Sequence, residues 1–163
     1  MQSSAYILLG SNLGNRMKML DDAEILINKY AGKVIHTSNT YETAAWGKTD
    51  QSSFLNKVIH LSTSHAPESL LKILLGIEQK MGRERIEKWG PRTIDADILY
   101  YDSIIINESK LVIPHPEIQS RRFTLIPLCE IAFNYMHPVF KISNSELLKQ
   151  CRDESEVTLY NLR

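Results

Sequence analysis

The sequence has little cysteine, no net charge and no long apolar run, and each absence excludes a class of protein. Its two cysteines, Cys129 and Cys151, form no Cys-x-x-Cys pair, so we assign them neither a disulfide nor a zinc site. The 19 basic residues balance the 19 acidic ones, which removes the broad positive field of a dedicated nucleic-acid binder. We therefore expect no nucleic-acid partner, and any anion-binding site must be local.

Signals for membrane insertion and export are also missing. Apolar runs such as residues 98–101 are far shorter than the roughly 20 residues needed to cross a bilayer. Residues 1–4 do not lead from a basic stretch into an apolar one with a small-residue cleavage site. We therefore expect a cytoplasmic monomer with no membrane partner. The length of 163 residues and the apolar fraction of 43% predict one domain over residues 1–163.

The spacing of apolar residues predicts alternating strands and helices. Leu70, Leu74 and Ile77 are three and four residues apart, as on one face of a helix. The predicted order is strand 4–9, helix 16–30, strand 34–43, strand 54–63, helix 67–81 and strand 93–101. This β-α-β-β-α-β order is typical of ferredoxin-like α+β folds, in which an antiparallel sheet carries its helices on one face.

The C-terminal third has a less regular pattern. We expect a short strand at 111–113, short helices at 123–132 and 146–151, and a weak strand at 157–160. These segments are additions to the ferredoxin-like core, and their pattern assigns no function to residues 134–163.

Two carboxylates inside an apolar strand are the sharpest chemical signal. Asp95 and Asp97 are two residues apart, so they share one face and lie about 6.6 Å apart along the strand. A bound divalent cation would explain such a pair, because carboxylate oxygens are ligands of Mg²⁺ and can hold it against a polyphosphate. A solvated sheet face is the alternative interpretation of the pair alone.

The segment before this strand is rich in cations. Arg83, Arg85, Lys88 and Arg92 outnumber Glu84 and Glu87 by two charges in a chain that is neutral overall. Guanidinium groups pair with phosphate oxygens, and a mobile basic loop can close over a nucleotide. The alternative is a charged surface loop with internal ion pairs.

Further residues could complete a nucleotide and ring site. His115 is held between two prolines and is followed by Arg121, which begins a second basic cluster. Phe54 and Asn56 share a strand face and would offer a stacking surface beside an amide. The glycines between residues 10 and 15 lack the Gly-Lys-Ser/Thr ending of a P-loop, so we interpret them as a turn and helix cap that could contact the substrate.

Taken in order, these motifs resemble the 6-hydroxymethyl-7,8-dihydropterin pyrophosphokinases over about residues 5–133. The matching motifs are Gly10-Ser11-Asn12-Leu13-Gly14, Tyr41-Glu42-Thr43, Trp46-Gly47, Phe54-Leu55-Asn56, Gly82-Arg83-x-Arg85, Trp89-Gly90-Pro91-Arg92-Thr93-Ile94-Asp95-x-Asp97, Pro114-His115-Pro116 and Arg121-x-Phe123. The resemblance implies transfer of the β,γ-diphosphate of ATP to the hydroxymethyl group of the pterin, with release of AMP, in folate biosynthesis.

The resemblance also implies roles for individual residues. Asp95 and Asp97 would hold two Mg²⁺ ions that bridge ATP. The pterin would stack between Phe54 and Phe123, and its edge would be read by Asn56 and by the chain at Thr43, Ala44 and Trp46. The positions that match nucleotide contacts are Glu78, Arg83, Arg85, Trp89, Arg92, Ile98, Lys110, His115 and Arg121. Of these, Arg83 and Arg92 are expected to assist catalysis.

The sequence departs from the family at three places. Lys88 stands where Arg is usual, Ala96 where Leu is usual, and Ala44-Ala45 where Glu-Pro or Pro-Pro is usual. No metal ligand or stacking residue is changed. Two other classes remain as alternatives: a ferredoxin-like RNA-binding module, and a nucleotidyl- or glycosyltransferase that uses the same acidic pair.

Overall fold

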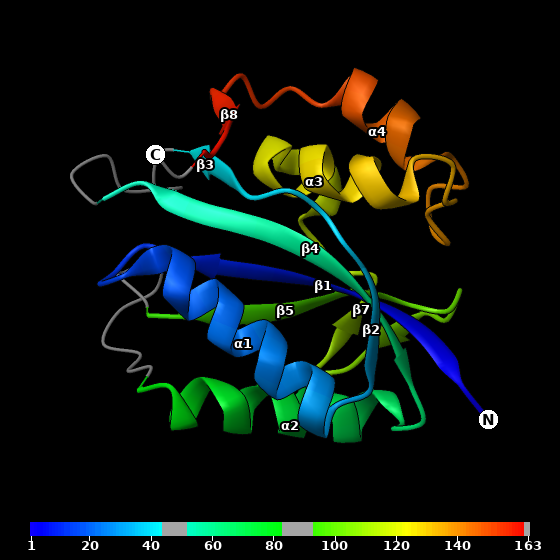
Figure 1. The fold of residues 1–163 in the computed structure, drawn as a ribbon. Coiled ribbons are helices and arrows are strands. Elements are labelled where there is room, and N and C mark those ends of the chain that lie inside the picture. Colours follow the sequence, from blue (N-terminus) through cyan, green and yellow to red (C-terminus); the bar gives the residue numbers. More distant parts are fainter. Residues whose placement is uncertain (44–51, 83–92, 162–163) are drawn as a thin grey trace.

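The computed structural model describes residues 1–43, 52–82 and 93–161, and within them a six-stranded sheet forms the centre of the fold (Figure 1). Its strands are β1 (Ser3–Ser11), β2 (Lys33–Thr37), β3 (Tyr41–Thr43), β4 (Phe54–Thr63), β5 (Asp95–Tyr101) and β8 (Val157–Leu159). Their order is β5-β1-β4-β3-β8, and β2 also pairs with β4. All these pairs are antiparallel, so the predicted ferredoxin-like arrangement is confirmed.

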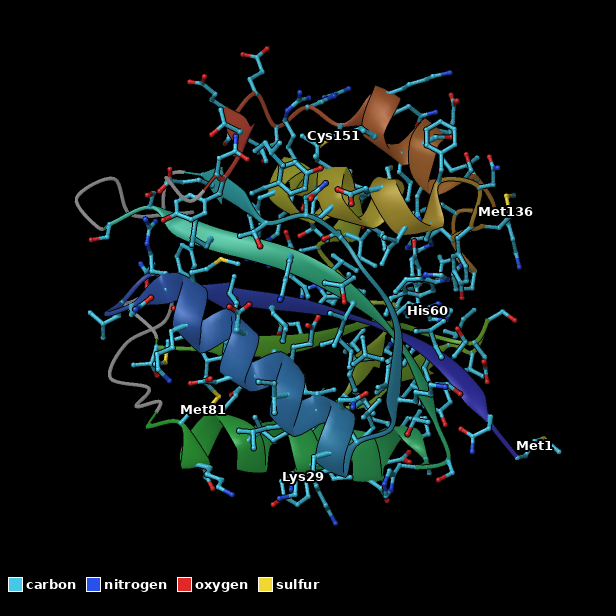
Figure 2. The ribbon with its side chains drawn as sticks, in the orientation of Figure 1. Met1, Lys29, His60, Met81, Met136 and Cys151 are labelled. Atoms are coloured by element: carbon cyan, nitrogen blue, oxygen red, sulfur yellow. The ribbon has the colours of Figure 1, made fainter. Side chains whose placement is uncertain are left out.

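Helices cover both faces of the sheet. The core helices α1 (Arg16–Tyr30) and α2 (Pro67–Lys80) lie on one face, as predicted, and α3 (Arg122–Ala132) and α4 (Asn144–Gln150) lie on the other (Figure 1). Met81, after α2, and Cys151, after α4, accordingly lie on opposite sides of the sheet (Figure 2). The second layer was not predicted. It forms because β1 is apolar on both faces, with Ile7 packed toward α1 and α2 and Leu8 toward α3.

Two strand boundaries differ from the prediction. The expected strand 34–43 is split into β2 and β3 at Ser38, whose N–H still donates to the Val58 carbonyl but whose Oγ, in place of its carbonyl, accepts the Val58 N–H at 2.9 Å. β1 continues past the expected turn, since Gly10 and Ser11 still pair with Asn56 and Leu55 of β4. Residues 3–11 therefore belong to the sheet.

The C-terminal additions follow the prediction closely. The predicted strand at 111–113 is β7 (Val112–Ile113), which pairs with the unpredicted β6 (Ile106–Asn107). A 3₁₀ turn, η1 (Ile118–Ser120), precedes α3. Of the helices in the described part of the chain, none combines the length and apolar character needed to cross a membrane.

Candidate active site

Three neighbouring strands place the two aspartates and Asn56 on one face of the sheet. Asp95 and Asp97 of β5 lie opposite Gly10 and Leu8 of β1, and Gly10 lies in turn opposite Asn56 of β4. Directly opposed residues of antiparallel strands share a face. Leu8 packs in the apolar cluster beneath α3, so all of these residues belong to the face that α3 covers.

The predicted pterin residues meet on the same face. Phe54 precedes Asn56 by two residues on β4, and Thr43 of β3 lies opposite Phe54. Phe123, the second residue of α3, packs against the apolar cluster of this face from the other side. The sheet and α3 thus contribute two opposing walls. Ala44 and Trp46 lie outside the described residues.

Gly10 is part of this site, whereas the sequence predicted a turn that could contact the substrate. A Cβ atom at position 10 would lie 2.6 Å from Asn56 Nδ2 and 3.7 Å from Phe54 Cδ1. A glycine inside an apolar strand often marks such a close approach, and this signal could have identified it. Gly10 therefore leaves the space that the Asn56 amide occupies.

The Asn56 amide is fixed with one end available for a ligand. Its Nδ2 donates to the Leu9 carbonyl at 3.3 Å, and its side chain is only 4% exposed. Within the described residues, no donor reaches its Oδ1 atom. A buried acceptor without a donor is costly, so Oδ1 is suited to accept an N–H group of a bound molecule.

The two aspartates were predicted to bind Mg²⁺, and their chemistry fits this ion. Both are half-buried and both present oxygen atoms, the ligands that Mg²⁺ prefers. Groups of three or more metal-ligating side chains do not occur in the described part of the chain. A pair of carboxylates nevertheless fits Mg²⁺, which usually retains water and takes further ligands from substrate phosphates.

Glu78 supports the strand between the two aspartates. Its carboxylate, on α2, is 3% exposed and accepts the backbone N–H of Ala96 at 2.9 Å. The bond reaches the strand from the face opposite Asp95 and Asp97. Glu78 was predicted to contact the nucleotide. Its hydrogen bond adds a structural role, because it fixes β5, the strand that carries Asp95 and Asp97.

His115 lies between the acidic pair and the second basic cluster. The pKa of His115 is lowered to about 4, mainly by burial and also by the Arg121 charge, while the charges of Asp95 and Glu117 partly oppose these effects. Its Nδ1 accepts the Glu117 N–H at 3.1 Å, so the neutral ring carries its proton on Nε2. His115 can therefore donate a hydrogen bond beside Asp95 at neutral pH.

Arg121 brings the predicted nucleotide and pterin contacts together. It occupies the N-cap position of α3, and its Cζ lies 5.6 Å from the centre of the Phe123 ring. This distance is within the range of a cation–π contact. A positive group is thereby held beside the predicted stacking ring.

Among the other residues predicted to contact the nucleotide, the structure describes Ile98 and Lys110. Ile98 is 5% exposed in the apolar core on the α1 and α2 face, so its side chain points away from Asp95 and Asp97. Lys110 is exposed between β6 and β7. Arg83, Arg85, Trp89 and Arg92 lie outside the described residues. The roles of all these residues stay predictions.

Comparison with known proteins gives a consistent family. Residues 6–133 match the 7,8-dihydro-6-hydroxymethylpterin-pyrophosphokinase (HPPK) family. The 2-amino-4-hydroxy-6-hydroxymethyldihydropteridine pyrophosphokinase of Methylorubrum extorquens is 43% identical over 129 residues, which is 78% of this chain and 82% of that protein. The protein of the same name from Haemophilus influenzae is 38% identical over 157 residues, covering 96% of this chain and 98% of that protein.

Solved structures agree on the fold. A crystal structure of HPPK-DHPS in complex with substrates has a TM-score of 0.76 at 18% identity, covering 92% of this chain and 43% of that one. The Plasmodium falciparum HPPK-DHPS A437G structure with SDX-DHP has a TM-score of 0.78 at 21% identity, covering 92% of this chain and 45% of that one. The chain therefore spans less than half the length of these two structures.

The sequence matches define a transferase that takes ATP as co-substrate. The chain belongs to the 7,8-dihydro-6-hydroxymethylpterin-pyrophosphokinase family, whose reaction is pyrophosphoryl transfer to hydroxymethyldihydropterin in folate biosynthesis. The family prediction made from the ordered motifs is confirmed. The RNA-binding and glycosyltransferase alternatives are not supported.

Proposed function

We propose that the α3 face of the sheet is where this chain transfers the β,γ-diphosphate of ATP to 6-hydroxymethyl-7,8-dihydropterin. The observation that carries the proposal is the row Asn56, Gly10 and Asp95 across three adjacent strands. Two strand spacings, roughly 10 Å, separate the backbone at Asn56 from that at Asp95. The row thus offers a ring-binding wall at one end and a metal-binding carboxylate at the other, with no side chain between them.

In this proposal Asp95 and Asp97 would hold two Mg²⁺ ions. The ions would supply charge neutralisation on the transferring diphosphate. The other described residues would position the substrates. Phe54 and Phe123 would stack on the ring, and Asn56 Oδ1 would accept one of its N–H groups.

Two further residues would hold the nucleotide. His115 would donate from Nε2, and Arg121 would pair its guanidinium with phosphate oxygens. The pterin hydroxyl oxygen would then attack the β-phosphorus in line while the bond to the α-phosphate oxygen breaks, so that AMP leaves. Arg83 and Arg92 are proposed to stabilise the transferring group.

The proposal takes residues 1–163 as one pyrophosphokinase domain. It is supported by α3 and α4, which pack on the sheet, and by β8, which adds a strand to it. The monomeric state and cytoplasmic location stay predictions.

Product analysis tests the proposal directly. The purified chain should convert MgATP and 6-hydroxymethyl-7,8-dihydropterin to AMP and the pterin diphosphate in equal amounts, as followed by ³¹P NMR and chromatography. Formation of ADP and a pterin monophosphate would contradict the diphosphate transfer. AMP formation that does not depend on the pterin would contradict the acceptor.

A further inference from the structure

We propose that Asp153, in the C-terminal tail formed by residues 151–161, is a positioning residue for the Phe123 ring and hence for the pterin. This inference rests on the proposed function. The tail lies beyond residue 133, where the family match ends. Figure 1 shows the tail running from α4, past α3, to β8 beside β3. It therefore reaches both walls of the pterin site.

The first contact of the tail is with the start of α3. The backbone N–H of Arg122, the first residue of this helix, donates to Asp153 Oδ2 at 2.9 Å. The first N–H groups of a helix need external acceptors, and Arg121 at the N-cap position cannot supply one because a guanidinium only donates. Asp153 thus caps α3 from 31 residues away, one residue before Phe123.

Asp153 is itself held in place. Its Oδ1 accepts the backbone N–H of Ser155 at 3.0 Å and the Ser155 hydroxyl at 2.5 Å. Burial raises the pKa of Asp153, but the hydrogen bonds from Ser155 and Arg122, together with the Arg122 charge, lower it overall. The carboxylate is therefore ionised at neutral pH, and a negative charge at a helix N-terminus is favourable.

The second contact of the tail is with the opposite wall. β8 pairs with β3, and Val157 lies opposite Thr43. The carbonyl of Glu156 accepts the Thr43 hydroxyl at 3.1 Å. Thr43 is next to Phe54 in the register of β3 and β4. The same short segment therefore bonds to the strand wall through Glu156 and to the helix wall through Asp153, which fixes the walls relative to each other.

Calorimetric titration of the full chain with 6-hydroxymethyl-7,8-dihydropterin, in the presence of Mg²⁺ and a non-hydrolysable ATP analogue, tests this role. Asp153→Ala should weaken pterin binding by about three- to tenfold, the range that loss of a helix cap implies. The matched control is Glu154→Ala, which removes the same charge from an exposed neighbour in the tail. It should bind the pterin as the parent chain does.

A double-mutant cycle separates positioning from general destabilisation. In a Phe123→Ala background, Asp153→Ala should cause no further loss of pterin affinity, because the ring that Asp153 positions is already absent. A purely structural role would give equal losses in both backgrounds, and this result would overturn the inference. If Asp153→Ala does not fold, Ser155→Ala is measured in the same cycle and should give a smaller loss that also disappears without Phe123.

The outcomes distinguish this inference from the proposed function. If the parent chain and Glu154→Ala do not bind the pterin, the proposed function is wrong and the inference with it. If both bind the pterin and Asp153→Ala binds it equally well, the proposed function stands and the role of Asp153 is wrong.

Discussion

The two faces of the central sheet differ most at the end where β1 carries Gly10. On the α1 and α2 face, Ile7 and Leu9 of β1 are fully buried in a continuous apolar core. On the α3 face, the same strand changes from Tyr6 and Leu8 to Gly10, and its neighbours change to amide and carboxylate side chains. The α1 and α2 face therefore stabilises the fold along β1. The α3 face lacks apolar packing at the Gly10 end of this strand, where polar side chains form the candidate site.

This difference between the faces predicts which substitutions should affect stability and which should affect activity. A polar group on a sheet contributes little to the core, so its loss is tolerated by the fold. Loss of an apolar side chain under α1 and α2 should instead lower stability and leave activity unchanged.

The largest effect is expected at the acidic pair. Asp97→Asn keeps the size of the side chain but removes the charge that we propose holds Mg²⁺, so turnover should fall by about a thousandfold or more. The unfolding temperature should stay close to that of the parent, because Asp97 is half-buried and outside the apolar clusters. AMP formation and calorimetric unfolding measure the two quantities. Parent-like turnover at ordinary Mg²⁺ would refute the metal assignment.

The opposite result is expected on the α1 and α2 face. Leu74 of α2 is fully buried in the apolar core, so Leu74→Ala should lower the free energy of unfolding by roughly 2–5 kcal/mol. Turnover per folded molecule should be unchanged. Leu75→Ala is the matched control, because Leu75 is 40% exposed and should cost far less. Urea unfolding of both variants checks this, and equal losses would contradict the burial argument.

An intermediate effect is expected at Gly10, which lies on the α3 face of the sheet, as the candidate site does. Gly10→Ala should displace the Asn56 amide and weaken pterin binding by roughly 1–3 kcal/mol, the cost of a buried polar group without its partner. Gly76→Ala is the control, since a Cβ there meets no atom of the described residues within 4 Å apart from its chain neighbours and the backbone of its own helix. In an Asn56→Ala background the Gly10→Ala effect on pterin titrations should vanish. A loss that persists there would mean that Gly10 acts through another group.

Sequence reasoning succeeded where local pattern and structure agree. The alternation around Ala96 predicted that Asp95 and Asp97 share a face, and the helix spacing of Leu70, Leu74 and Ile77 predicted the core face of α2. Both patterns depend only on the geometry of one element. The register of β1 against β4 and β5 depends on two other segments, so the Asn56–Gly10–Asp95 row was not predicted.

Polar contacts between residues far apart in the sequence could not be predicted either. Asp153 accepts the N–H of Arg122, and Glu78 accepts the N–H of Ala96, across many intervening residues. No spacing rule connects such partners, since the contact is set by how helices dock on the sheet. The split of the predicted strand 34–43 has a similar cause, because it depends on the contact of Ser38 with Val58.

The smallest effect is expected from an ion pair that ties β3 to α1. Arg16 Nη1 lies 2.7 Å from Glu42 Oε2, and the hydrogen bond from Arg16, followed by that from Ser53, lowers the pKa of Glu42. A carboxyl whose pKa is lower in the folded state stabilises the fold above its unfolded pKa, and this stabilisation is lost as the pH falls through the folded value. Glu42→Gln should therefore lower the free energy of unfolding at pH 7 by less than about 1 kcal/mol. The difference from the parent should disappear below the lowered pKa of Glu42, as measured by urea unfolding at a series of pH values. A difference that stays constant down to pH 3 would show that the charge of Glu42 does not stabilise this side of the sheet.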